Sequence, residues 1–147
     1  MSTEVAGEDA AAIAQLYAKY SQGHDFGEPG RWVEVFTPAG TLALHRPGAS
    51  GPDVTTGADA LRAKVEAKVH RVPPSDRPMK RHVNDTLVLD LLEDGAVAGR
   101  AYFRVLDHAD LDASGRPAVA SSGIYRDRIV RTDDGWRFDH RAVTYDE

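Results

Sequence analysis

The last third of the sequence contains three strand-like segments in close succession, residues 101–106, 123–130 and 135–138. The last two are joined by Thr-Asp-Asp-Gly at residues 132–135, a composition typical of tight turns between antiparallel strands. Further strands are expected at residues 41–45 and 81–92, with the first of the three segments extended to 97–106. Because helical stretches come first, the sequence predicts an α+β domain in which helices and a curved antiparallel sheet enclose a pocket.

The helices are indicated by apolar residues three and four positions apart. A first helix is expected to begin after Gly7 and to end at residues 21–23, so that Asp25 follows it. One face of this helix carries Ile13, Leu16, Tyr17 and Tyr20. The other expected elements are a second helix at 29–36 with Trp32 turned inward, a third helix at 57–70, and turns or loops at 37–40, 46–56 and 107–117.

Length and charge restrict the class of protein. At 147 residues the chain is long enough for a single domain with one substantial core, and residues 1–8 and 145–147 are expected to be loose ends. The formal net charge of −5 disfavours a nucleic-acid surface, and no apolar run approaches the ~20 residues of a membrane span. We therefore expect a cytoplasmic protein that binds neither nucleic acid nor a membrane.

The reactive residue types also exclude several chemistries. The chain has no cysteine, which rules out disulfides, thiolate metal ligands and cysteine nucleophiles. The histidines show no His-x-x-x-His spacing, and no Gly-x-Gly-x-x-Gly or phosphate-binding loop is present. We expect no metal and no cofactor. His24, His70 and His108 are interpreted as surface residues, and His45 as an exposed strand end, with a place at the pocket rim as the alternative.

Four local patterns follow one another along the chain. They are Tyr17-x-x-Tyr20 followed by Asp25 and Trp32-x-x-x-Phe36-Thr37, then Arg81-His82-Val83-Asn84-Asp85 at a strand start, then Gly123-x-Tyr125-x-Asp127, and finally Asp134-Gly135-Trp136-Arg137-Phe138 followed by Arg141. With these patterns the chain resembles the SnoaL-like family of the nuclear-transport-factor-2-like superfamily, from about Asp9 to Thr144. The resemblance implies a cone, in which a strongly bent antiparallel sheet carries the N-terminal helices on its concave face around a pocket.

The resemblance restricts function less than fold, because one fold hosts many activities. It implies a polyketide cyclase, a dehydratase or an isomerase, and also allows a subunit without chemistry of its own. The chain departs from the family pattern at two positions. Ala39 stands where an aspartate is frequent, and Asp85 stands where asparagine is common after the histidine, although Asn84 lies next to it.

His82 and Asp25 are the first candidates for chemistry. An imidazole with a pKa near ~6.5 can take and return a proton around neutral pH, and in the resembling dehydratases a histidine at this strand start does so. The resemblance implies that Asp25 orients this histidine or acts as a base itself. The alternatives are a solvated histidine beside Lys80 and Arg81, and an aspartate that caps the next turn.

Other matching residues are candidates for binding the substrate. Tyr20 and Arg141 are expected to polarise a carbonyl, because a phenol or a guanidinium stabilises an enolate. Further substrate contacts are expected from Tyr17, Trp32, Asn84, Tyr102, Tyr125 and Asp127. The alternative for a tyrosine on an apolar face is a place in the core with its hydroxyl hydrogen-bonded. Tyr102 and Phe103 have opposite parities, so only one of them can line the pocket.

Strand alternation orients the residues from Gly123 onward. Arg126 and Arg128 are expected on the solvent-facing side of the strand, so Tyr125 and Asp127 should point toward the interior. A buried Asp127 needs a partner, and Arg141 is available on the next strand. We interpret this pair as an internal salt bridge, with binding of a substrate carboxylate or enolate oxygen as the alternative.

The final strand raises the question of oligomeric state. Its large residues Trp136, Phe138 and His140 share the parity opposite to Arg141. One explanation is that this face packs a dimer contact. A homodimer is expected, because the resembling folds pair through the convex face of the sheet.

Three functions are compatible with these residues. The first is a cofactor-independent acid–base enzyme, a dehydratase, isomerase or cyclase, acting on a small, largely apolar carbonyl or polycyclic compound. The second is a non-catalytic carrier of a small ligand or an accessory subunit. The third, epoxide hydrolysis, needs two aspartates and an arginine around a water, and Asp127 with Arg141 supplies only two of the three.

Overall fold

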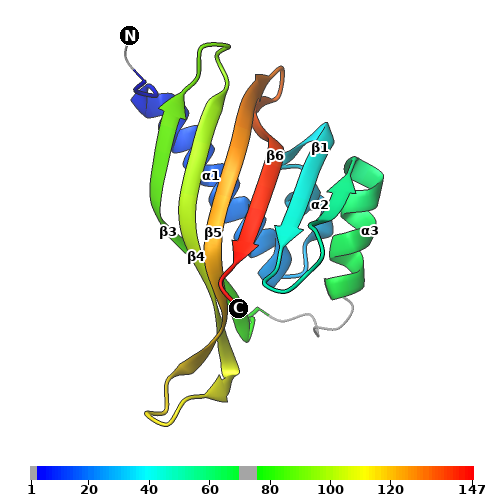
Figure 1. Ribbon diagram of the computed structural model, residues 1–147, viewed down its shortest axis with the longest axis vertical. Helices are drawn as coiled ribbons and strands as arrows, with labels where there is room; N and C mark the ends of the chain where they lie inside the picture. Colours follow the sequence, from blue (N-terminus) through cyan, green and yellow to red (C-terminus); the bar gives the residue numbers. More distant parts are fainter. Residues whose placement is uncertain (1–2, 70–75) are drawn as a thin grey trace.

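The computed structural model describes residues 3–69 and 76–147, which form an α+β fold (Figure 1). Its helices are α1 (Gly7–Asp25), α2 (Pro29–Val33) and α3 (Ala58–Val69). Its strands are β1 (Phe36–His45), β2 (Asp53–Thr56), β3 (Lys80–Leu91), β4 (Val97–Leu111), β5 (Pro117–Thr132) and β6 (Gly135–Tyr145). No helix within the described residues is both long and apolar enough to cross a membrane.

All six strands belong to one sheet in the order β2-β1-β6-β5-β4-β3. Strands β3 to β6 pair antiparallel in sequence order, which confirms the expected meander. The pairing of β1 with β6 is parallel, so the sheet is mixed rather than purely antiparallel. It is parallel because the chain leaves β1 for β2 and α3 and crosses to the far edge before it returns along the meander. The α+β class and the curled sheet with helices against it are confirmed.

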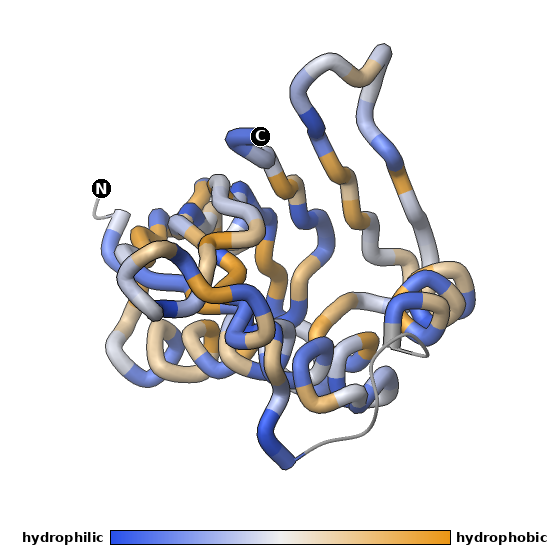
Figure 2. The backbone as a smooth tube through the Cα atoms, turned by 90° about the horizontal axis from the view of Figure 1, so that it is seen from below, coloured by the Kyte–Doolittle hydropathy of each residue, from blue (hydrophilic) through white to orange (hydrophobic). Residues whose placement is uncertain are grey.

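Helix α1 packs one face against the sheet. Its buried side chains include the four expected from spacing, Ile13, Leu16, Tyr17 and Tyr20. Figure 2 shows hydrophobic and hydrophilic positions interspersed along the backbone, and buried residues of β4 alternate with more exposed ones from Val97 to Val105, as a sheet with one covered face requires. Near the start of the helix, the carboxylate of Asp9 accepts hydrogen bonds from Trp136 Nε1 at 2.9 Å and from Arg131 at 2.6 Å. These bonds fix the start of α1 to the β5–β6 hairpin.

A β-bulge in β6 changes the interpretation of its parity. Arg128 pairs with His140 but the next residue, Ile129, pairs with Phe138, which leaves Asp139 as the extra residue. Phe138 and Arg141 are therefore both fully buried on the same face of the sheet, while His140 is exposed. Trp136 and Phe138 belong to the core, so the expectation that they form a dimer contact was wrong.

Several element boundaries differ from those expected. Helix α1 continues through Asp25, and residues 37–40, expected as a turn, form part of β1 with an irregular register. The short strand β2 lies within the loop expected at 46–56, and β4 continues to Leu111 inside the loop expected at 107–117, whose last residue, Pro117, begins β5. Tyr145 ends β6, and the amide of Asp146 donates to the Ser122 carbonyl at 2.9 Å. His70 lies outside the described residues.

Candidate active site

Asp25 and His82 form a hydrogen-bonded pair although 57 residues separate them. Asp25 is the last residue of α1, and His82 lies near the start of β3. One carboxylate oxygen of Asp25 accepts the backbone amide of His82 at 2.8 Å, and the other lies 2.6 Å from His82 Nδ1. This two-point contact fixes both the backbone and the ring of the histidine. It also makes Nδ1 the protonated nitrogen, so that Nε2 carries the basic lone pair.

His24 adds a second imidazole that sequence reasoning placed on the surface. Its ring stands edge-on to His82 with the centroids 4.6 Å apart, and its Nδ1 lies 3.6 Å from Asp25 Oδ1. Burial lowers the pKa of His24, which favours its neutral form. Burial would raise the pKa of Asp25, but hydrogen bonds with His24 and His82 outweigh it and hold this pKa below its usual value. Asp25 therefore stays ionised beside two imidazoles.

These three side chains are also where a metal ion could be held among the described residues, since one ligand atom of each lies within 4.8 Å of the others. The observed contact of 2.6 Å between Asp25 and His82 Nδ1 is a hydrogen-bond distance. Two ligands at about 2.1 Å from one ion stand farther apart than that. The arrangement present is a hydrogen-bonded pair.

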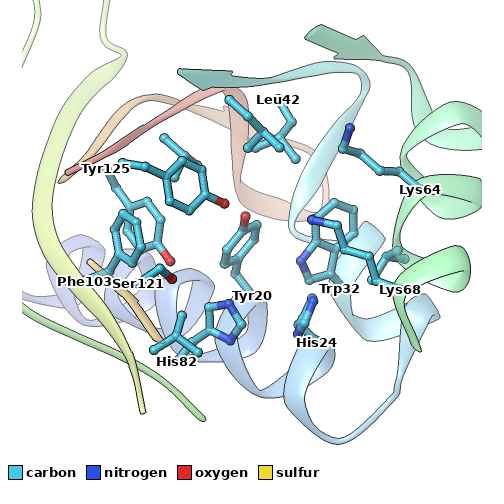
Figure 3. Close-up of a pocket in the computed structure, with 15 residues that line it drawn as sticks. Tyr20, His24, Trp32, Leu42, Lys64, Lys68, His82, Phe103, Ser121 and Tyr125 are labelled. Carbon is cyan, nitrogen blue, oxygen red and sulfur yellow. The ribbon is translucent and has the colours of Figure 1, made fainter. Parts of the chain in front are cut away.

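His82 lines a pocket between the sheet and the helices (Figure 3). The apolar wall consists of Leu42, Leu44, Val65, Phe103, Val105 and Val143. The polar lining includes His24, His82, Ser121 and the hydroxyl-bearing Tyr20, Tyr125 and Tyr145. The accessible volume is about 50 Å³, whereas small-molecule sites usually offer roughly 300–1,000 Å³. A substrate with fused rings therefore requires the side chains at the mouth to move.

Two of the expected tyrosines line this pocket, and a third does not. Tyr20 and Tyr125 line it, and Figure 3 shows both hydroxyls directed into it. Burial raises the pKa of both phenols, so they stay protonated and act as hydrogen-bond donors. Tyr17 lies behind them and does not line the pocket; its hydroxyl donates to Asp127 at 2.5 Å. Trp32, expected as a substrate contact, lines the pocket.

Arg141 and Asp127 form a fully buried salt bridge beneath the pocket. The guanidinium donates from Nε and Nη2 to the two carboxylate oxygens at 2.8 and 2.9 Å. Burial opposes the charge on Arg141, but Asp127 more than compensates and raises the pKa of the guanidinium. The rings of Tyr20 and Tyr125 lie 4.3 and 4.0 Å from it. The internal salt bridge is thus the observed arrangement, and neither residue lines the pocket. Since Arg141 and Tyr17 occupy the carboxylate of Asp127, the pair does not support epoxide hydrolysis.

Two further expectations are corrected or reassigned. Tyr102 is 53% exposed on the outer face of β4, whereas Phe103 is buried and lines the pocket, so the expectation for Tyr102 was wrong. Asn84 donates from Nδ2 to Ser21 Oγ at 2.7 Å, a bond that joins β3 to α1. Asn84 is therefore beside the Asp25–His82 pair without lining the pocket.

Sequence reasoning missed the lysines of the pocket. Lys64 and Lys68 reach toward it from α3 (Figure 3). Lys64 lies 2.8 Å from Asp53 of β2, and the structure shows no carboxylate partner for Lys68 among the described residues. Their spacing of four residues on a helix was visible in the sequence, but nothing there shows which face of α3 meets the pocket.

A bent sheet, a helix-covered concave side and a cavity with an oriented histidine define a pocket-forming α+β protein. Residues 6–142 match the model of the SnoaL-like domain, and the chain therefore belongs to this family. A search of curated proteins finds no significant match.

Solved structures of other proteins share the fold along nearly the whole chain. A protein from Catenulispora acidiphila, solved in complex with S-DNPA, is 29% identical, with 93% of this chain and 92% of that chain covered and a TM-score of 0.71. ActVI-ORFA from Streptomyces coelicolor is 25% identical, with 93% and 97% covered and a TM-score of 0.72. A protein from Novosphingobium aromaticivorans, assigned as the beta subunit of an aromatic-ring-hydroxylating dioxygenase, is 19% identical, with 98% and 93% covered and a TM-score of 0.75.

Proposed function

We propose that this protein is an acid–base enzyme that moves a proton on a small, largely apolar carbonyl compound without a cofactor. The observation that carries the proposal is the contact between Asp25 and His82 at the wall of a pocket lined by both apolar and polar side chains. An ionised carboxylate on Nδ1 fixes the tautomer of His82 and stabilises the imidazolium that forms when Nε2 takes a proton.

The proposed reaction begins with proton abstraction by His82 Nε2 from the carbon next to the substrate carbonyl. The electron pair of the broken C–H bond moves to the carbonyl oxygen and forms an enolate. The hydroxyls of Tyr20 and Tyr125 are hydrogen-bond donors for that oxygen. Return of the proton to another carbon gives isomerisation, and its transfer to a leaving hydroxide gives water and a dehydrated product. Attack of the enolate carbon on a second carbonyl carbon forms a C–C bond, and the resulting alkoxide takes the proton from His82, which gives cyclisation.

Arg141 supports these tyrosines rather than touching the substrate. Its guanidinium lies against the rings of Tyr20 and Tyr125, and its buried Nη1 has no hydrogen-bond partner in the described part of the chain. We assign it a positioning role, in place of the carbonyl contact expected from the sequence. Asp127 and Tyr17 have the same positioning role, because Asp127 accepts hydrogen bonds from both Arg141 and Tyr17.

Deuterium exchange at the carbon next to a ketone tests the proposal directly. We would follow the α-proton signals of cyclohexanone and 2-tetralone by NMR in D₂O with catalytic amounts of protein. Removing a positioned general base typically costs on the order of 10²–10⁴-fold in rate, so we expect His82→Asn to lose exchange to that extent. Asp25→Asn should lose less, because the base remains but its tautomer is no longer fixed. His45→Asn, at the exposed end of β1, is the matched control and should exchange like the wild type. Equal exchange by His82→Asn and wild type would exclude this mechanism.

A non-catalytic accessory or ligand-binding role is the second candidate. It is favoured by the accessible volume of about 50 Å³, which is small for an enzyme acting on ring systems. The fold shared with a protein assigned as a dioxygenase beta subunit is compatible with it. In that case no ketone would exchange, and the protein would co-purify with a larger enzyme.

We also propose a homodimer that pairs through the outer face of the sheet. Tyr102 and Val88 lie there with 53% and 44% of their surfaces exposed, and large exposed apolar side chains on a sheet face favour a covered interface. Light scattering of wild type and of Tyr102→Lys tests this, because the variant should shift the mass toward the monomer.

A further inference from the structure

A buried hydrogen-bond donor faces the pocket without an acceptor. Trp32 is 3% exposed and lines the pocket, yet its indole Nε1 has no hydrogen-bond partner among residues 3–69 and 76–147. Buried donors in folded proteins are nearly always satisfied, by protein, by water or by a ligand. The second tryptophan of the chain follows this rule, since Trp136 Nε1 donates to Asp9. The free N–H of Trp32 therefore indicates an acceptor that the pocket receives.

Positive charge collects at the same side of the pocket. Lys64 and Lys68 come from α3, and the guanidinium of Arg46, 4.0 Å from the ring centre of the pocket residue Tyr145, is near enough for its charge to act on Lys68. Asp53 is the carboxylate that balances this group, and it pairs with Lys64. Lys68 has no ion-pair partner among the described residues, and the charge of Asp53 only partly offsets those of Lys64 and Arg46 around it. Burial of its amine, together with the charges of Lys64 and Arg46, lowers the pKa of Lys68, as expected for a cation held among cations.

This local charge is opposite to that of the whole chain, whose formal net charge is −5. Several cations gathered at one opening concentrate anions there and orient them on approach. A neutral ketone would gain nothing from such an opening. A substrate with an acidic group would gain both attraction and orientation.

We propose that the substrate carries a carboxylate, bound between the Lys68 amine and the Trp32 indole N–H at the α3 side of the pocket. This inference rests on the proposed function, because it assigns the substrate class of the same site. Figure 3 shows the two donors on one side of the pocket and His82 on the other. A carboxylate held at Lys68 and Trp32 therefore leaves the apolar, carbonyl-bearing end of the substrate beside Tyr20, Tyr125 and His82.

Binding of matched aromatic probes tests the inference without knowledge of the true substrate. Benzoate and benzamide have nearly the same size and ring, but only benzoate is an anion. We expect calorimetric titration of the purified wild type to give at least tenfold tighter binding of benzoate, with a preference that falls as salt is raised. Inorganic phosphate is expected to bind weakly, because it lacks the apolar ring that the pocket walls contact. Equal affinity for benzoate and benzamide, or tighter binding of phosphate than of benzoate, would overturn the assignment.

Two variants locate the carboxylate, and a third is the control. Lys68→Met keeps the length of the side chain and should reduce benzoate affinity to that of benzamide. Trp32→Phe removes the N–H and should weaken benzoate more than benzamide. Lys80→Met removes an exposed lysine of β3 and should leave the preference unchanged. A full preference in the Lys68→Met variant would disprove the site even if Trp32→Phe failed to fold.

The outcome for this inference is separable from that for the proposed function. His82→Asn should retain the preference for benzoate while it loses deuterium exchange. Exchange by the wild type without any preference for benzoate would refute the carboxylate site alone. A preference for benzoate without exchange of any ketone would refute the enzyme and leave the carboxylate site standing as a binding site.

Discussion

The substitution Asp127→Asn tests how far the structure depends on its buried ion pair. Asparagine keeps the shape of the side chain but removes the charge opposite Arg141, which is 0% exposed. It also weakens three hydrogen bonds, those from Arg141 Nε, Arg141 Nη2 and the hydroxyl of Tyr17. The guanidinium has no route to water, because Phe138 and three tyrosine rings surround it.

The expected magnitude follows from this burial. Removing one partner of a buried pair typically lowers the free energy of unfolding by about 3–5 kcal/mol, because the remaining charge is left uncompensated. With a urea m-value of about 2 kcal/mol per M, a loss of about 4 kcal/mol lowers the unfolding midpoint by about 2 M. Tryptophan fluorescence during urea unfolding measures both quantities, and Trp32 and Trp136 are both buried in the folded state.

Two further variants distinguish an uncompensated charge from a general loss of packing. The double variant Asp127→Leu with Arg141→Met removes both charges and should be more stable than Asp127→Asn. Arg104→Met removes an exposed partner of Asp85 and should lower the free energy of unfolding by less than about 1 kcal/mol. A loss below about 1 kcal/mol for Asp127→Asn, or a double variant less stable than the single one, would refute the reasoning.

Three other perturbations have definite expected outcomes. Gly123→Ala should destabilise the sheet strongly in thermal unfolding, because the added methyl group would lie 2.0 Å from the Thr144 carbonyl oxygen and 2.7 Å from the Phe103 ring; an unchanged Tm would contradict this packing. Burial lowers the pKa of His24 below its ordinary ~6.5, so the unfolded state binds more protons and stability is lost as the pH falls from about 7 through the folded-state pKa. His24→Gln should flatten this part of the pH profile, and a profile identical to that of the wild type would count against a buried neutral His24. The pKa of Asp25 is lowered below its ordinary ~3.9, so its contribution to the free energy of unfolding is present above that pH and is lost as the pH falls below it. Asp25→Asn should remove this acid-dependent loss of stability, measured by urea unfolding at low pH. An unchanged loss in the variant would contradict the assignment.

The sequence allowed the layout of the fold and part of the site to be predicted. Spacing placed the inward face of α1 correctly, and alternation turned Tyr125 and Asp127 inward, because each depends only on the local period of its own element. The approach of Asp25 to His82 depends instead on how α1 lies across β3. The family patterns pointed to both residues, whereas local chemistry alone left capping and surface roles open for them.

The remainder depends on tertiary geometry that leaves no local signal. Neighbouring residues of a strand point to opposite faces of the sheet, so only one of Tyr102 and Phe103 could line the pocket. The sequence does not show which one, because it does not show which face of the sheet the helices cover. The role of Lys68 depends on the parallel pairing of β1 with β6, which brings α3 to the pocket. A pattern of apolar residues on α3 shows which side is buried and does not show what the polar side faces.

The bulge at Asp139 also has an evolutionary consequence. It allows one strand to present Phe138 and Arg141 to the same face, which strict alternation forbids. Deleting a single codon there would restore alternation and turn either the aromatic or the cationic half of β6 toward solvent. We therefore expect this segment to tolerate an exchange of the side chain at residue 139 better than a change in its length. A library of single-residue deletions along β6 should show its deepest loss of folded protein at this position, while exchanges of the side chain at the same position survive.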